Sequence, residues 1–312
     1  MSTISPPTVG HTPVMVDEVL DNLAVQPGGL WVDSTVGGGG HAEAVLEAVL
    51  PGGRLLGIDA DPSALHLASP RLARFGDAAL LVEGNFRDLA AICRAHDFVP
   101  TNGVLLDLGL SSLQLSDEAR GFSFQTEAPL DMRLSPRQDL TAADIVNTYS
   151  EQELAALLWR HGQERHSRAI ARRIVRERPL STTLELARAV QRAVGRGRFR
   201  IHPATRTFQA IRIAVNAELE NLTLALDQAR DVLDHGGRLV AISYHSLEDA
   251  IVKDFLRREG RDCICPPETP ICICGHEATL RPITRRALRP NPAEVAVNPR
   301  SRSARLRAAE RI

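Results

Sequence analysis

The chain has 312 residues, of which 44% are hydrophobic and 24% charged, and its formal net charge is -1. This length allows about two domains with substantial hydrophobic cores. No apolar run approaches the roughly eighteen residues of a membrane span. The opening residues M-S-T-I-S-P-P lack the charged and apolar regions of a secretory signal. We therefore expect no membrane segment and a cytoplasmic location.

A glycine turn stands between two apolar runs near the start of the chain, where W-V-D-S-T-V-G-G-G-G-H-A is followed by G-R-L-L-G-I-D. Gly37, Gly39 and Ala42 fit the pattern G-x-G-x-x-[GA], in which glycines let the backbone turn tightly beside a ligand. Asp59 lies about twenty residues beyond the turn, where a carboxylate can accept both hydroxyls of a ribose. A bare glycine cluster would indicate only a mobile turn. Strand, turn, helix and distal acid together predict a nucleotide-type cofactor site.

Acidic side chains near this turn indicate which cofactor it binds. Asp33 precedes the turn and His41 follows it, and a carboxylate here repels a pyrophosphate but attracts a cation. The run G-V-L-L-D-L-G adds Asp107 at the end of another expected strand. Ligands bind at the carboxyl ends of such strands, so Asp33, Asp59 and Asp107 are expected to line one crevice. S-adenosylmethionine, which carries a sulfonium, an ammonium and a ribose, fits these acids. The alternative interpretation, that each acid merely caps the turn that follows it, explains one acid more easily than all three.

Seven segments resemble those of one known family. They are His11 to Met15, Val36 to His41, Leu105 to Leu115, Arg120 to Phe124, Pro129 to Arg133, His202 to Arg212 and Ser243 to Asp249. The resemblance is to bacterial methyltransferases that modify the exocyclic N4 of a decoding-centre cytidine in 16S ribosomal RNA, and it runs nearly end to end. It implies an α/β fold with a Rossmann-like class I methyltransferase domain, S-adenosylmethionine as cofactor and 16S ribosomal RNA of the small subunit as partner. No obligate protein partner is indicated.

The resemblance also assigns cofactor-binding residues by position, and all of them are intact. They are Gly39, Gly40, His41, Asp59, Phe86, Asp107 and Gln114. The first three match the family's cofactor turn, the fourth its ribose-side acid, the fifth its adenine neighbour and the last two its later cofactor contacts. An inactive relative that only binds RNA as an assembly factor should have lost some of them. A dinucleotide oxidoreductase, the other alternative, should have a first turn free of acids.

Two residues are candidates to accept a hydrogen of the reacting amine. Asp107 and His245 are both expected at strand ends that face the crevice, and such an acceptor directs the nitrogen lone pair at the methyl group. His245 has the alternative role of capping the helix that starts near Ser246. The tetrad of an acidic or Asn residue, Pro-Pro and an aromatic, which many DNA amino-methyltransferases carry, is absent because the strand ends D-L-G-L. The target cytosine must therefore be held by residues other than such a tetrad.

The spacing of the expected strands predicts an insertion. After Asp107 the next convincing strand is G-R-L-V-A-I-S-Y-H, much further along than the roughly thirty residues that a doubly wound domain needs. Residues 1-115 and 204-312 are therefore assigned to a discontinuous methyltransferase domain, and 116-203 to an inserted helical domain for substrate recognition. Inside the insert, two capping boxes pair Ser150 with Glu153 and Thr182 with Glu185. One long helix is expected to follow from residue 204, with Phe208, Ile211, Val215, Leu219, Leu222 and Leu226 on its buried face.

Arginines cluster in and after this insert. Arg165, Arg168, Arg172 and Arg176 recur at helical spacing and predict one basic stripe, with Ile170 and Ile174 toward a core; Arg196, Arg198, Arg200 and Arg206 follow. Such patches neutralise phosphates even in a nearly neutral protein. A solvated helix face without a ligand is the alternative interpretation.

Four of the five cysteines, Cys263, Cys265, Cys272 and Cys274, form the pattern C-x-C-x6-C-x-C, while Cys93 stands alone. Zinc sites usually use C-x2-C steps, and a two-residue step points thiols less readily at one ion. A reducing compartment disfavours disulfides. We therefore expect a reduced surface loop here and assign no metal ligands, with metal binding as the alternative.

Overall fold

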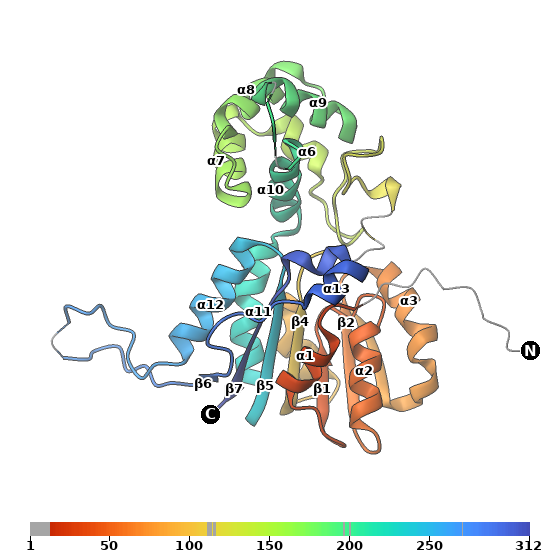
Figure 1. The fold of residues 1–312 in the computed structure, drawn as a ribbon, viewed down its shortest axis with the longest axis vertical. Helices are drawn as coiled ribbons and strands as arrows, with labels where there is room; N and C mark the ends of the chain where they lie inside the picture. The colour runs from red at the N-terminus through yellow and green to blue at the C-terminus, as the bar shows by residue number, and fades with distance from the viewer. Residues whose placement is uncertain (1–12, 111–113, 115–116, 196, 200, 270) are drawn as a thin grey trace, which may run out of the picture. The chain divides into compact units, whose positions relative to one another are not determined.

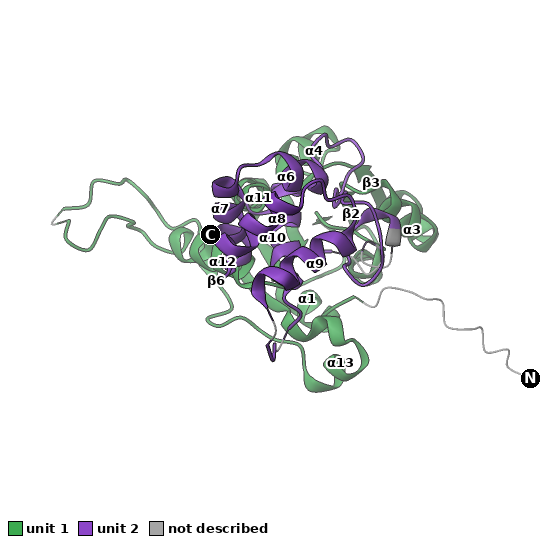
Figure 2. Cartoon of the chain, turned by 90° about the horizontal axis from the view of Figure 1, so that it is seen from above, with its two compact units in different colours: residues 1–109, 220–312 green, residues 110–219 purple. Residues whose placement is uncertain are grey.

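The computed structural model describes residues 13-110, 114, 117-195, 197-199, 201-269 and 271-312. They form two compact units, one made of the chain up to Gly109 together with Glu220-Ile312, and the other of Leu110-Leu219 (Figure 2). The first unit is built around a sheet and the second from helices (Figure 1). Within the described part of the chain, no helix combines the length and the apolar character needed to cross a membrane.

A seven-stranded sheet with strand order β3-β2-β1-β4-β5-β7-β6 forms the α/β unit (Figure 1). Adjacent strands among β1 to β5 pair in parallel, whereas β7 runs antiparallel to both β5 and β6. The strands are β1 (Leu30–Asp33), β2 (Arg54–Asp59), β3 (Ala79–Glu83), β4 (Thr101–Asp107), β5 (Leu233–Ser243), β6 (Leu280–Pro282) and β7 (Arg305–Arg311). The predicted α/β class with a Rossmann-like sheet is confirmed.

Helices cover both faces of this sheet. The α-helices are α1 (Val16–Leu23), α2 (Gly40–Val49), α3 (Pro62–Leu72), α4 (Leu89–Ala95), α11 (Glu218–Val232), α12 (Ser246–Glu259) and α13 (Pro292–Val297), and the 3-10 turns are η1 (Ala73–Ala78), η2 (Phe86–Asp88) and η4 (Pro299–Ser303). On β4, Val104 and Leu106 belong to the core shared with α4, α11 and α12, whereas Leu105 belongs to the core shared with α1, α2 and α3. This alternation follows from the two-residue repeat of a strand, and both faces of the sheet are therefore packed against helices.

The helical unit has its own hydrophobic core. Its elements are η3 (Glu118–Arg120), α6 (Ala142–Thr148), α7 (Glu151–Gly162), α8 (Ser167–Glu177), α9 (Thr183–Val194) and α10 (Ala204–Asn216). Both predicted capping boxes are confirmed, with Ser150 bonded to Glu153 and Thr182 to Glu185. Each box satisfies backbone N–H groups that a helix start leaves free, so the sequence marks the beginnings of α7 and α9 directly.

The helical unit extends further in both directions than the range 116-203 expected for the insert. Helix α10 belongs to it, because Phe208 and Ile211 pack in the helical core. The expectation of one long helix from residue 204 is wrong. Ala217 adopts a left-handed conformation with φ 47° and ends α10, and Leu222 in the following α11 packs on the sheet. The apolar periodicity therefore continues across two helices that belong to different units.

Candidate active site

Three carboxylates end three neighbouring strands. Asp33 is the last residue of β1, Asp59 of β2 and Asp107 of β4, and β1 lies between the other two strands. The chain leaves β1 toward β2 on one side and returns with β4 on the other, so the strand order reverses at β1 and β4. Ligands of open α/β sheets bind at such a switch point, outside the carboxyl ends of the strands. The three acids thus meet where the sequence predicts them.

Asp33 has a buried carboxyl group whose two oxygens differ in their hydrogen bonding. Its side chain is 2% exposed, and its Oδ1 accepts a hydrogen bond from the backbone N–H of Thr35 at 3.1 Å. Within the described part of the chain, Oδ2 has no hydrogen-bond partner. Burial raises the pKa of Asp33 to about 7; the neighbouring His41 opposes this shift, and the charges of Asp107 and Asp59 add to it. A buried acid with an unused oxygen is suited to a cationic ligand group.

Asp59 connects the glycine turn to the end of β2. Its Oδ2 accepts a hydrogen bond from the N–H of Gly37, and its Oδ1 from the N–H of Asp61, both at 2.9 Å. The side chain is only partly buried, and each carboxylate oxygen has a second lone pair. Asp59 can therefore hold the turn and still accept hydroxyl groups of a ribose.

The turn itself requires glycine at two positions for different reasons. Gly39, the N-cap of α2, has φ 79°, a left-handed conformation that glycine adopts without strain. Gly40 has ordinary helical geometry, but a Cβ there would lie 2.9 Å from Cγ of Pro13. The helix start carries no side-chain cap, and the first N–H groups of a helix have no partner within the helix, so they can serve as donors for a ligand.

Asp107 is fixed by three neighbours. The hydroxyl of Tyr244 donates a hydrogen bond to its Oδ1 at 2.9 Å, and Nδ1 of His41 lies 3.5 Å from its Oδ2. The backbone N–H of Asp107 donates to Oγ1 of Thr35 at 2.7 Å. On its other side, the His41 ring places Nε2 2.8 Å from the carbonyl oxygen of Val14, which can only accept, so Nε2 carries the hydrogen.

Tyr244 is the residue that the sequence did not single out. It follows β5 directly, and burial together with the adjacent Asp107 charge raises its pKa well above the ordinary value. The phenol is therefore an O–H donor throughout the physiological pH range. The only signal in the sequence was its place in S-Y-H-S, a segment considered for its histidine.

His245 occupies the N-cap of α12. Its Nδ1 accepts a hydrogen bond from the N–H of Glu248 at 3.3 Å, and its Nε2 lies 3.1 Å from Oε1 of the same residue. The carboxylate of Glu248 also accepts from the N–H of Tyr244. The capping role weighed for His245 is confirmed, and a part in accepting an amine hydrogen stays a prediction.

The two remaining predicted cofactor residues lie in different units. Phe86 begins η2, three residues after the end of β3, and is partly buried against the core of the α/β unit. Gln114 is buried, with 5% of its side chain exposed, but it belongs to the helical unit. Its contact with the cofactor stays a prediction. The motif residues 1-12, 111-113 and 115-116 lie outside the described residues.

Two motifs of the helical unit have architectural roles. The guanidinium of Arg133 pairs with the Asp131 carboxylate at 2.8 Å, and Arg120 donates to the carbonyl oxygens of Arg133 and Leu134. A Cβ on Gly121 would lie 2.2 Å from the carbonyl oxygen of Pro129. These segments belong to the family motifs, and the charged groups named here form ion pairs and hydrogen bonds that stabilise one turn.

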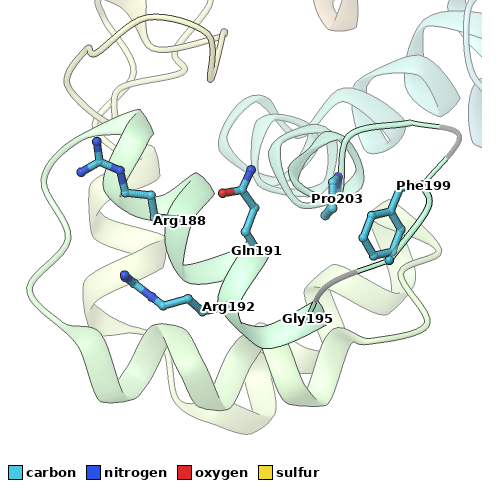
Figure 3. A pocket seen from close by; sticks show the side chains of 7 residues that line it. Arg188, Gln191, Arg192, Gly195, Phe199 and Pro203 are labelled. Carbon is cyan, nitrogen blue, oxygen red and sulfur yellow. The ribbon is translucent and has the colours of Figure 1, made fainter.

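Exposed arginines and one pocket mark the surface of the helical unit. The predicted stripe is confirmed for three of its four arginines: Arg168, Arg172 and Arg176 are exposed on α8, where Ile170 and Ile174 are fully buried. Arg165 lies in the turn before this helix and not on it. A pocket of about 600 Å³ lies between α9 and the segment that follows it, and its lining includes the side chains of Arg188, Gln191, Arg192, Phe199 and Pro203 (Figure 3). Arg196 and Arg200 of the second predicted cluster lie outside the described residues.

The four clustered cysteines converge, although their two-residue spacing led us to expect that they would not. The structure brings all four Sγ atoms of Cys263, Cys265, Cys272 and Cys274 within 4.8 Å of one another. A two-residue step on each side of a folded loop can therefore direct both thiols of each pair to a common point.

The sheet order, the three strand-end acids and the glycine turn define an S-adenosylmethionine-dependent methyltransferase of class I. The unused oxygen of Asp33 is the feature that fits a cationic cofactor rather than a pyrophosphate. A family model described as "MraW methylase family" matches residues 8–312, and the chain belongs to this family.

Curated relatives agree with the family. The chain is 58% identical over 302 residues to "Ribosomal RNA small subunit methyltransferase H" of Dehalococcoides mccartyi, covering 97% of this chain and 86% of that protein. It is 54% identical over 310 residues to the protein of the same name from Thermomicrobium roseum, covering 98% and 95%. Among solved structures, a putative rRNA-methylase from Clostridium thermocellum has a TM-score of 0.45 and 14% identity, covering 98% of this chain and 100% of that chain.

Proposed function

We propose that this enzyme transfers a methyl group from S-adenosylmethionine to the exocyclic N4 of one cytidine in 16S ribosomal RNA. The printed names of the curated relatives support ribosomal RNA of the small subunit as the substrate class. The observation that carries the chemistry is the convergence of Asp33, Asp59 and Asp107, with one unused buried oxygen, beside a glycine turn. An RNA substrate in a ribosomal subunit places the enzyme in the cytoplasm.

Each acid then has its own task. The cofactor supplies an activated methyl group on a positively charged sulfur. Asp59 accepts its ribose hydroxyls while bonded to Gly37, and Asp33 offers Oδ2 to its positive charge. The N–H groups at the start of α2 remain available to polar groups of the ligand. These residues bind and orient the donor, and none of them has to accept or donate a proton in the transfer step.

Asp107 is proposed to orient the acceptor. The lone pair of a cytosine amine is delocalised into the ring, so the amine is a weak nucleophile and alignment matters more than basicity. A carboxylate that accepts one amine hydrogen turns the lone pair toward the methyl carbon, and such positioning can supply several kcal/mol of the barrier. Tyr244 and His41 hold the carboxylate that would do this.

The helical unit is proposed to recognise the RNA. Its exposed arginines on α8 supply charges for phosphates, and the pocket beside α9 combines Arg188 and Arg192 with Phe199, whose side chain is 46% exposed. Aromatic faces next to basic groups stack unpaired bases. The target nucleotide must be unstacked to be methylated, so a chain that combines an RNA-recognising unit with a catalytic unit suits this substrate.

Transfer of labelled methyl groups tests this proposal. Small ribosomal subunits from cells that lack the activity are incubated with the enzyme and tritiated S-adenosylmethionine. We expect tritium in the RNA, and none with Asp107→Asn or Asp59→Asn. A non-catalytic assembly factor, the alternative function, would bind the subunit but transfer nothing.

A further inference from the structure

We propose that the loop between α12 and β6 binds one thiophilic metal ion in tetrahedral geometry, Zn²⁺ being the expected ion. Its ligands are Cys263, Cys265, Cys272 and Cys274. This site is separate from the cofactor site, and it gives the loop a fixed shape rather than taking part in methyl transfer.

The distances between the sulfur atoms match such a site. The Sγ atoms of Cys272 and Cys274 are 3.5 Å apart, and those of Cys274 and Cys263 are 3.9 Å apart. Four thiolates at about 2.3 Å from a tetrahedral Zn²⁺ are about 3.8 Å from one another. A disulfide would require about 2.05 Å, and all four cysteines are free thiols.

The backbone of the loop explains why the two-residue steps converge. One C-x-C lies on each limb of the loop. The N–H of Ile264, between the first pair, points to Sγ of Cys274, and the N–H of Ile273, between the second pair, points to Sγ of Cys265, each at 3.5 Å. The central N–H of each limb thus faces a sulfur of the other limb. Hydrogen bonds of this kind orient metal ligands and stabilise their charged form.

Both ends of the loop are shaped to keep the limbs together. At the base, the N–H of Ala278 donates to Oδ1 of Asp262 at 3.2 Å, and Thr279 donates to the carbonyl oxygen of Glu259 at 2.8 Å. Toward the tip, the N–H of Thr269 donates to the carbonyl oxygen of Pro266 in a turn. The four cysteines lie between these fixed points.

The loop has little else to hold it. Figure 1 shows it as a long segment that runs out from the α/β unit, and no helix or strand is assigned between α12 and β6 in the described residues. Its apolar side chains face solvent, with Ile271 77% and Ile273 84% exposed. A long segment without a hydrophobic core needs a metal or a disulfide to fix its shape.

The ligand set indicates the kind of metal. Four thiolates in tetrahedral geometry select zinc or a single iron, since harder cations prefer oxygen ligands. Nε2 of His276 lies 3.0 Å from the carbonyl oxygen of Arg258, so this neighbouring histidine is engaged by the backbone and the site is a four-cysteine one. With every coordination position taken by protein, such a site is structural.

Metal analysis of the purified full-length enzyme tests the proposal. The protein is prepared under reducing conditions without added chelator, and its metal content is measured by plasma mass spectrometry. We expect one zinc per chain in the wild type and in the control Ile271→Ser, an exposed position of the same loop. The double variant Cys263→Ser/Cys272→Ser should lose the metal but keep S-adenosylmethionine binding, which shows that the rest of the protein is folded.

A second measurement uses the wild type alone and so does not depend on a variant that folds. After removal of the metal, one equivalent of Co²⁺ should give thiolate-to-cobalt charge-transfer absorption together with the intense visible bands of a tetrahedral ion, and Zn²⁺ should abolish both. Metal below a tenth of the protein concentration, with no cobalt–thiolate spectrum, would overturn the proposal. So would an intact mass that shows the loop cysteines joined as two disulfides in the reduced preparation.

Discussion

The hydroxyl of Tyr244, which follows β5, donates a hydrogen bond of 2.9 Å to Oδ1 of Asp107, the last residue of β4. These side chains are 137 positions apart in the chain, and they meet because β4 and β5 are parallel neighbours. Tyr244 is partly buried and stays protonated, so it presents a fixed donor to the carboxylate proposed to orient the amine. Several properties of the enzyme follow from this contact and from the acids beside it.

Replacing Tyr244 by Phe should slow methyl transfer more than it weakens cofactor binding. Loss of a hydrogen bond to a charged group costs about 1.5–3 kcal/mol, which corresponds to roughly a 10- to 100-fold lower kcat if the bond positions Asp107 in the transition state. The Kd for S-adenosylmethionine should change by less. Tyr149→Phe, in the helical unit, is the control because these are the only two tyrosines. Equal losses in kcat and in cofactor affinity would contradict a role in orienting the acceptor.

Cofactor binding should strengthen as the pH rises through about 7. In the free enzyme Asp33 has a pKa of about 7, raised from 3.8 mainly by burial, so it is largely neutral at lower pH. A cation at Oδ2 favours the ionised form, and binding therefore releases a proton below pH 7 and none well above it. Calorimetry in two buffers of different ionisation enthalpy measures this release. Asp33→Asn should bind the cofactor weakly and without this pH dependence.

The same substitution should stabilise the enzyme in the absence of cofactor. An acid whose pKa is higher in the folded state than in the unfolded state binds more protons when folded, so it lowers the free energy of unfolding as the pH rises from about 4 to 7. Asp33→Asn removes this effect, and its melting temperature should exceed that of the wild type at pH 8. Asp77→Asn, at an exposed position, should leave the melting temperature unchanged. A less stable Asp33→Asn protein at pH 8 would mean that the carboxylate is satisfied without a ligand.

Gly40→Ala should damage the cofactor turn by displacing Pro13. The added Cβ would lie 2.9 Å from Cγ of that proline, which is closer than unstrained packing allows, and the N-terminal segment would have to shift. We expect the Kd for S-adenosylmethionine to rise at least tenfold. Gly76→Ala adds a methyl group in open space, but at φ 53° and ψ −132°, a backbone conformation that is unfavourable for residues with a Cβ, so it should cost about 1–3 kcal/mol of stability and leave binding intact. If both variants bind S-adenosylmethionine with wild-type affinity, the turn does not require glycine at position 40.

The basic stripe on α8 should act on RNA and not on the cofactor. The double variant Arg168→Gln/Arg176→Gln removes two exposed charges, and the slope of log K against log salt for RNA binding should decrease by roughly 1.5. Arg94→Gln, exposed on α4 of the other unit, is the control. An unchanged salt dependence in the double variant would make the stripe a merely solvated helix face.

The strand ends and helix starts were predicted correctly because they depend on local signals in the sequence. Asp33, Asp59 and Asp107 each end a short apolar run, and strand ends are visible in one dimension. The capping boxes of α7 and α9 are equally local. Tyr244 could not be predicted as a partner of Asp107, because their contact depends on which strands become neighbours.

The break between α10 and α11 and the cysteine cluster were not predicted, because both depend on the folded structure. The apolar period runs on through α10 and α11, and alanine gives no sign that residue 217 takes a left-handed conformation and divides the helices between two units. The cysteine spacing looked unfavourable because it departs from the C-x2-C step that zinc sites usually use. Only the folded loop, with reciprocal N–H contacts from Ile264 and Ile273, brings the thiols together.

Nucleoside mass spectrometry shows which atom of which base the enzyme methylates. Small ribosomal subunits from cells that lack the activity are treated with the enzyme and S-adenosylmethionine, and the digested 16S RNA is analysed for methylated nucleosides. We expect new N4-methylcytidine at a single position, absent with Asp107→Asn. Methylation of a different base or atom, or no methylated nucleoside on subunits and free 16S RNA alike, would contradict this expectation.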